Sequence, residues 1–152
     1  MDLRFTANKY GPYAERLRHL LDALDGSYLH CEKRLSDAGP FDTIWFEDSK
    51  CEIVRDYLET DEARDYLPPL ERTAAIIDGF EAPLCMELLA TVDWLISQRG
   101  CERSVSGLRE GLSSWPGGPT AARRKQAIFD DRMLGLALER LMRVAPSTAT
   151  RR

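Results

Sequence analysis

Residues 79–95 form the stretch that most constrains the fold, because apolar side chains cover nearly its whole helical circumference. Gly79 ends one helical pattern, and Pro83 suits the first turn of the next, where its missing N–H costs no hydrogen bond. A helix that is apolar over so wide an arc is covered on several sides. We therefore expect a central buried helix at about residues 83–98, with the rest of the chain packed around it. Its apolar positions, spaced at about 3.6 residues, are Leu84, Leu88, Leu89, Val92, Leu95 and Ile96.

The composition is that of a folded globular chain. Of 152 residues, 43% are hydrophobic and 30% are charged, which is enough apolar material for one ordinary core. We expect a single domain at residues 1–145, followed by a disordered tail at 146–152.

The cellular location and the metal content also follow from composition. No apolar run reaches the roughly eighteen residues that a membrane span needs, and Asp2 and Arg4 stand where a signal peptide would be apolar. We expect a cytoplasmic protein with no membrane partner. The four cysteines form no C-x-x-C pair and have only His19 and His30 as companions, so we expect free thiols and no metal site.

The N-terminal third predicts a small antiparallel sheet. Residues 27–33 and 43–47 read as two strands of a hairpin, separated by an Asp-Ala-Gly-Pro turn, and residues 3–6 form an extended piece that joins them. Between residues 3–6 and the hairpin, a turn at 9–13 leads into a leucine-striped helix with Pro12 in its first turn.

Helical patterns dominate from Ser49, a candidate N-cap, to the end of the chain. Pro68 and Pro69 interrupt one segment, and a Pro/Gly loop at 115–119 follows a short helix at about 103–112. A last helix spans 127–143. The fold class is therefore α+β: an α-rich domain with a small antiparallel sheet near the N-terminus.

No short catalytic motif is present. The chain lacks a G-x-S-x-G elbow, a Walker loop, an H-E-x-x-H pair and a Rossmann glycine fingerprint. His30 and Cys31 are adjacent, but neighbours on a strand point to opposite faces and would not form a thiol–imidazole pair. We therefore expect no catalytic residues, no cofactor and no enzyme activity.

Charge leaves several functions open. The net charge of −4 argues against a nucleic-acid-binding surface spread over the whole domain. Acidic clusters at 47–48, 59–65 and 130–131 are either ordinary solvated faces or a surface that binds a basic partner by imitating nucleic-acid phosphates. A DNA-binding regulator is the alternative, in which the helix at 103–112 and the one after Lys125 form a helix-turn-helix-like pair and residues 123–125 contact phosphate. A homo-oligomeric scaffold of leucine-rich helices is a third reading.

Several blocks of residues resemble the C-terminal region of DarG antitoxins. They are FTANKYGPYAERLRHLL at 5–21, LDGSY at 24–28, GFEAP at 79–83 and MELLATVDW at 86–94, followed by Trp115, Phe129, Ala137 and Leu141. The resemblance covers most of residues 3–143 in order.

This resemblance implies a partner and a site. In the family, the region follows a macro domain that hydrolyses ADP-ribose from DNA, and it binds DarT, a toxin that ADP-ribosylates bases in single-stranded DNA. It blocks DarT by occupying the DNA-binding groove. We therefore expect a DarT-like ADP-ribosyltransferase as partner and no direct nucleic-acid binding. The expected partner-binding residues, which are the polar and aromatic ones in the matched turn and the acidic faces, are Lys9, Tyr10, Tyr13, Glu15, Arg16, Glu47 and Asp48.

The chain also departs from the family pattern. The matched blocks include no part of a macro domain, which we expect to be lost or encoded separately, so the activity of that domain is not carried over. Leu84 and Cys85 stand where relatives carry an aromatic residue and a glycine, and Asp93 stands where they carry a histidine.

Overall fold

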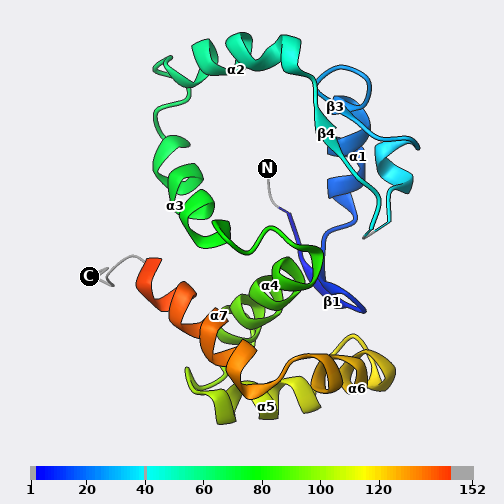
Figure 1. Cartoon of the computed structure of the whole chain (residues 1–152), viewed down its shortest axis with the longest axis vertical. Helices are drawn as coiled ribbons and strands as arrows, with labels where there is room; N and C mark the ends of the chain where they lie inside the picture. Colours follow the sequence, from blue (N-terminus) through cyan, green and yellow to red (C-terminus); the bar gives the residue numbers. More distant parts are fainter. Residues whose placement is uncertain (1–2, 40, 145–152) are drawn as a thin grey trace. The chain divides into compact units, whose positions relative to one another are not determined.

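A computed structural model of the chain describes residues 3–39 and 41–144. Within these residues the chain forms seven α-helices and two two-stranded sheets (Figure 1), which confirms the α+β class. The described residues fall into two compact units: 3–6 with 13–71, here called the first unit, and 7–12 with 72–144, here called the second unit. The prediction of one domain at 1–145 stays a prediction, and the expected tail at 146–152 lies outside the described residues.

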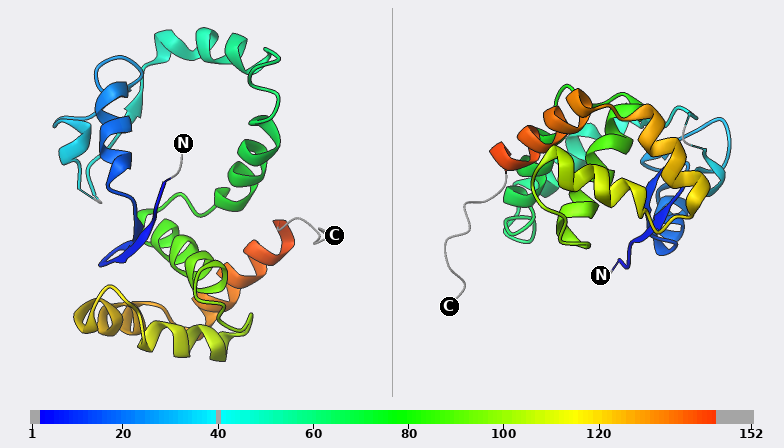
Figure 2. Two further views of the ribbon diagram at one scale, coloured as in Figure 1. Left: turned by 180° about the vertical axis from the view of Figure 1, so that it is seen from behind. Right: turned by 90° about the horizontal axis from the view of Figure 1, so that it is seen from below.

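The second unit is built around α4 (Pro83–Ser97), as predicted for residues 83–98. Helices α5 (Val105–Ser113) and α7 (Asp131–Val144) pack on α4, and α6 (Pro119–Ile128) packs on α5. Figures 1 and 2 show α7, in orange to red, beside the green α4. The core of this unit comprises Leu88, Leu89, Val92, Leu95, Leu108, Leu112, Trp115, Ala121, Ala122, Phe129, Leu134, Ala137 and Leu138.

Local signals explain where the core helices begin. Pro83 lies in the first turn of α4, which needs no N–H donor at that position. Ser104 caps α5, since its hydroxyl oxygen accepts the N–H of Gly107 at 3.0 Å. Both helices turn leucines inward: Leu88, Leu89 and Leu95 on α4, and Leu108 and Leu112 on α5.

The first unit contains the predicted hairpin. Strands β3 (Leu29–His30) and β4 (Trp45–Phe46) pair antiparallel, with Leu29 opposite Phe46 and His30 opposite Trp45. The same unit holds α1 (Arg16–Leu24), the 3₁₀ turns η1 (Leu35–Asp37) and η2 (Asp48–Lys50), and α2 (Cys51–Leu58). Helix α3 (Leu67–Ile77) starts in the first unit and ends in the second.

Two predictions near the N-terminus are wrong. The first strand is β1 (Thr6–Asn8) rather than residues 3–6, and it pairs with β2 (Gly11–Tyr13) instead of joining the hairpin. Pro12 therefore lies in a strand, and α1 begins only at Arg16. The physical reason is Gly11, whose φ of 140° only glycine adopts readily and which returns the chain into an extended strand.

Three predictions about later helices are also wrong. Ser49 does not cap α2, because it lies in η2 and its N–H and hydroxyl both donate to Glu47. Pro68 and Pro69 lie in the first turn of α3, where they interrupt nothing. Residues 119–128 form the helix α6, so α5 and the helix after Lys125 are not the consecutive pair that the DNA-binding alternative needs.

Within residues 3–39 and 41–144, no helix is both long and apolar enough to cross a membrane.

Candidate partner-binding site

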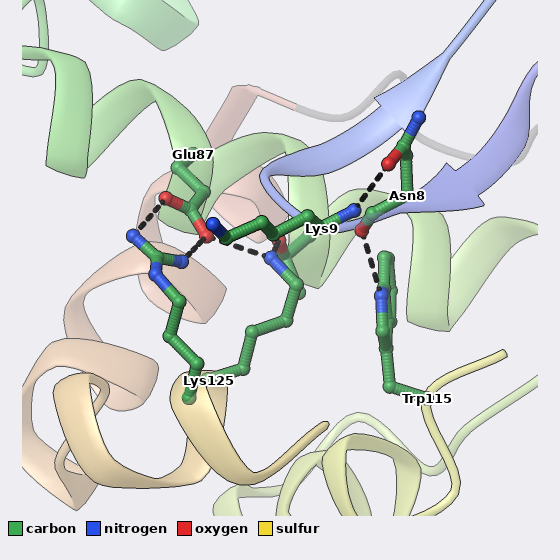
Figure 3. Close-up of polar contacts among 7 residues, drawn as sticks. Asn8, Lys9, Glu87, Trp115 and Lys125 are labelled. Carbon is green, nitrogen blue, oxygen red and sulfur yellow. Dashed lines mark hydrogen bonds and ion pairs between the residues drawn. The ribbon is translucent and has the colours of Figure 1, made fainter. Parts of the chain in front are cut away.

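The turn between β1 and β2 belongs to the second unit and is anchored by residues from later in the same unit. The backbone carbonyl of Asn8 accepts a hydrogen bond of 2.9 Å from Trp115 Nε1, and its side-chain oxygen accepts the N–H of Lys9 at 2.6 Å (Figure 3). Gly117 permits this approach, since a Cβ there would lie 2.5 Å from Trp115 Nε1 and 2.9 Å from the Asn8 carbonyl oxygen. The turn is thus fixed at its start by a contact between residues 107 positions apart.

A buried ion cluster lies in the same unit. Glu87, on α4 and only 8% exposed, accepts two hydrogen bonds from the Arg124 guanidinium, at 2.5 and 3.0 Å. It also accepts one of 2.8 Å from the ammonium of Lys125, which donates a second of 3.1 Å to the hydroxyl of Thr91. Figure 3 shows Lys125 pointing toward Glu87 and Trp115 pointing toward Asn8. The cluster joins α4 to α6 through charged hydrogen bonds, in addition to the apolar core that both helices share.

Lys125 is fully buried, and aromatic rings complete its surroundings. Its Nζ lies 4.9 Å from the ring centroid of Trp115 and 5.5 Å from that of Phe129. Burial lowers the pKa of Lys125, while the hydrogen bond to Glu87 opposes that shift. The hydrogen bond to Glu87 raises the pKa of Arg124.

Two predicted site residues, Lys9 and Tyr10, lie on this supported turn. Tyr10 is 38% exposed, and its ring centroid lies 4.9 Å from the Arg124 guanidinium carbon and 5.0 Å from Lys9 Nζ. Because Glu87 holds Arg124, the ring rests on a side chain that is itself fixed. The turn therefore presents one aromatic ring and one ammonium group in a defined position.

The ion cluster also corrects the interpretation of residues 123–125. The sequence alone favours a basic patch for phosphate in the DNA-binding alternative, but Lys125 is buried and Arg124 is bound to Glu87. Only Arg123 of the three is exposed. Glu87 is one of two carboxylates inside the apolar stretch 83–97, and it is the buried one. A carboxylate in so apolar a helix was the available signal that a cation must meet it, and the sequence analysis missed Glu87.

Three further predicted residues gather in the first unit. Tyr13, Glu15 and Arg16 line an open hollow of about 540 Å³ together with Arg4 and Thr6. The Thr6 hydroxyl donates to the Tyr13 carbonyl at 3.4 Å, which links the two strands at this point.

Glu47 and Asp48 lie between β4 and α2 in the same unit. Glu47 accepts hydrogen bonds from the hydroxyl and N–H of Ser49 and pairs with His30 Nε2 at 2.9 Å. These bonds, those from Ser49 first, lower the pKa of Glu47. Asp48 is exposed. The His30 side chain is thus engaged by Glu47 and stacks on Trp45, with ring centroids 6.0 Å apart.

Negative charge concentrates around these two residues. Residues 47–65, here called the acidic segment, contain eight acidic and three basic residues, so this short stretch is more negative than the whole chain at −4. Seven of the eight carboxylates are exposed, and Glu47 is half-buried. Such a surface attracts a basic partner.

The structure gives no arrangement for a bound metal in the residues that it describes. No three His, Cys, Asp or Glu side chains there gather into a possible metal site. Cys31, Cys51, Cys85 and Cys101 are free thiols.

Comparison with known proteins finds three relatives that share one name. A DNA ADP-ribosyl glycohydrolase of Mycobacterium tuberculosis is 30% identical over 148 residues, which cover 94% of this chain and 39% of the relative. The chain is related to the DNA ADP-ribosyl glycohydrolases, or DarG proteins. The protein of that name from Mycobacterium bovis gives the same values, and that from Thermus aquaticus is 31% identical over 147 residues, covering 94% of the chain and 36% of the relative. No family model matches the chain.

The match to the DarG proteins is partial: the chain spans about two fifths of the length of these relatives. The prediction of no enzyme activity is corrected, because these relatives carry the name of an enzyme and the missing motifs do not exclude a glycohydrolase. The match covers only part of those relatives, so the activity in their name is theirs and is not assigned to this chain.

Proposed function

We propose that this chain is the toxin-binding region of a DarG-type antitoxin. It binds a DarT-type DNA ADP-ribosyltransferase and inhibits it by occupying the groove that takes single-stranded DNA. In this proposal the chain corresponds to the part of its relatives that follows the macro domain. The observation that carries the proposal is its relation to DarG proteins over 94% of its length.

The matched turn supports this function. Lys9 and Tyr10 belong to the block that resembles the family, and the turn that bears them is anchored by Trp115 and by the Glu87–Arg124 pair. A side chain that is held in place before binding loses little conformational freedom on contact, and affinity gains accordingly. The turn is therefore suited to a specific protein contact.

The acidic segment supports the choice of groove. A channel that binds single-stranded DNA is positively charged, and eight carboxylates within nineteen residues complement it. The association should then weaken as salt concentration rises, because screening acts on exposed charges.

The experiment is an inhibition assay with a purified DarT-type transferase and a single-stranded DNA substrate. Adding the chain should abolish ADP-ribosylation, and a direct binding measurement should give micromolar or tighter affinity. No association at micromolar concentration would refute the proposal.

Variants test which surface is used. Replacing Lys9 and Tyr10 together by alanine, or Glu47 and Asp48 together by their amides, should weaken binding at least about tenfold, since central interface contacts carry most of the affinity. Arg132→Ala is the control for the loss of an exposed positive charge on α7. A control variant that weakens binding as much as the test variants would show that the effect is not specific to these residues.

Because the relatives are named DNA ADP-ribosyl glycohydrolases, the chain is also tested for removal of ADP-ribose from DNA. DNA that is already ADP-ribosylated is incubated with the chain alone, and release of ADP-ribose is measured. Inhibition without release supports blocking of the transferase. Release that accounts for the whole loss of modified DNA would mean that the chain reverses the modification instead of binding the toxin.

A further inference from the structure

The first unit has very little apolar core. Only Ala14, Leu35 and Ala63 are buried hydrophobic residues there, whereas thirteen of the sixteen in the described chain belong to the second unit. Helices α1 and α2 bury no residue. A segment as long as residues 13–71 needs far more buried apolar surface than this to offset the conformational entropy lost on folding.

The same unit exposes many large apolar side chains. Ile53 and Tyr57 on α2 are 53% and 48% exposed, and Trp45 on β4 is 47% exposed. Exposed apolar surface on this scale marks an interaction site. The unit holds eleven of the sixteen exposed large hydrophobic residues in the described chain: Phe5, Tyr13, Leu24, Phe41, Ile44, Trp45, Phe46, Ile53, Tyr57, Tyr66 and Leu70.

Charge selects the kind of partner that covers this surface. Ile53 and Tyr57 lie within the acidic segment, and Trp45 lies two residues before it. A second copy of the chain would bring two such segments together, and like charges repel. A partner with basic residues around an apolar floor would neutralise the carboxylates while it covers the rings.

We propose that the first unit completes its folding on a basic partner protein, with the apolar side chains of β4 and α2 packing into an apolar-floored groove whose rim is positively charged. The inference rests on the proposed function in one respect, namely that this partner is the DarT-type transferase. Folding is then coupled to binding, so the interface supplies the core that the free unit lacks.

Hydrogen exchange of the backbone amides tests the coupling, with the full chain measured alone and in complex. In the free chain the amides of α2 should exchange at least about a hundredfold faster than those of α4, which lies in a real core. In the complex the exchange of α2 should slow at least about tenfold. Exchange in free α2 as slow as in α4 would overturn the proposal, and so would a complex that leaves α2 unprotected.

Substitutions on α2 test the surface itself. Ile53→Ser with Tyr57→Ser should weaken binding at least about tenfold without lowering the urea midpoint of the free chain, because neither residue belongs to a core. Leu136→Ser with Met142→Ser is the matched control, since these α7 residues are 49% and 54% exposed in the second unit. Equal losses in both variants, or a lowered midpoint in the α2 variant, would overturn the inference.

The two proposals fail in different ways. If the transferase binds and the α2 variant binds equally well, the inference fails and the proposed function stands. If the transferase does not bind, the proposed function fails, and slow exchange of free α2 would then overturn the inference as well. A dimer of the free chain that protects α2 would mean that a second copy covers this surface, which also overturns it.

Discussion

Replacing Glu87 by glutamine should destabilise the second unit strongly. Among residues 3–39 and 41–144, Glu87 alone supplies a carboxylate to both Arg124 and Lys125, at 2.5 and 2.8 Å. The amide keeps the shape of the side chain but loses its charge. Arg124 is 27% exposed at its side chain and can turn toward water, whereas Lys125 is fully buried and cannot. The cost therefore falls mainly on Lys125.

The magnitude follows from the burial of Lys125. Removing one partner of a buried ion pair costs about 3–5 kcal/mol, and the bond to the Thr91 hydroxyl places the expected loss near the lower value. For a unit of this size each kcal/mol lowers the melting temperature by about 4–8 °C. We expect a loss of ~3 kcal/mol and a fall of roughly 12–24 °C.

Urea unfolding followed by tryptophan fluorescence measures this loss. Trp94 and Trp115 lie in the second unit with ring centroids 5.0 Å apart, so a Trp45→Phe background confines the signal to that unit. Glu139→Gln on α7 is the matched control, because Glu139 is exposed and its replacement should change stability by no more than about 0.5 kcal/mol.

A second substitution tests the cause. Adding Lys125→Met removes the buried charge that Glu87→Gln leaves unpaired, so the double variant should recover about 2 kcal/mol relative to Glu87→Gln alone. Losses that add within about 0.5 kcal/mol would refute the reasoning, because the two side chains would then act independently. A loss below about 1 kcal/mol for Glu87→Gln would refute it too.

Three other predictions follow from the second unit. Burial lowers the pKa of Lys125 in the folded chain, so the unfolded chain binds more protons at pH values between that lowered pKa and 10.5. The free energy of unfolding should therefore rise with pH in this window. Urea midpoints measured between about pH 7 and pH 10 should show this rise, and the rise should be smaller in Lys125→Met. Gly111→Ala should lower stability by about 1–3 kcal/mol in thermal unfolding despite alanine's better helix propensity, because the new Cβ would lie 2.7 Å from Cys101 Sγ. Ser104→Ala should cost about 1 kcal/mol in urea unfolding, since it removes the acceptor for the Gly107 N–H.

The fold was predictable where the pattern of apolar residues was long and regular. Helix α4 has apolar residues over several turns, and its predicted and observed bounds agree. Strands β1 and β2 have three residues each, which is too short for an alternating pattern to stand out. Helix α6 was missed because its buried face consists of Ala121, Ala122 and Lys125, which carry no strong apolar signal.

The candidate site was predictable only in part, for a related reason. Lys9 and Tyr10 came from a resemblance in local sequence, and the structure places both on the supported turn. The support itself comes from Glu87 and Trp115, which lie far away in the sequence. A lysine is expected at the surface unless a buried carboxylate is known to bind it. The burial of Lys125 could therefore not be predicted from the spacing of residues in the sequence.

The contact between Asn8 and Trp115 also sets an order of events during synthesis. The second unit is assembled from residues 7–12 and residues 72–144, with the whole stretch 13–71 translated in between. At about 5–20 residues per second, the first strand waits roughly 5–20 s before Trp115 is made. Over that interval the nascent turn has none of its supports, and contacts of such sequence separation form late in folding. The turn that we propose as the point of contact with the toxin is therefore among the last parts of the second unit to be completed, and a partner that depends on it can be recognised only after translation has passed α6.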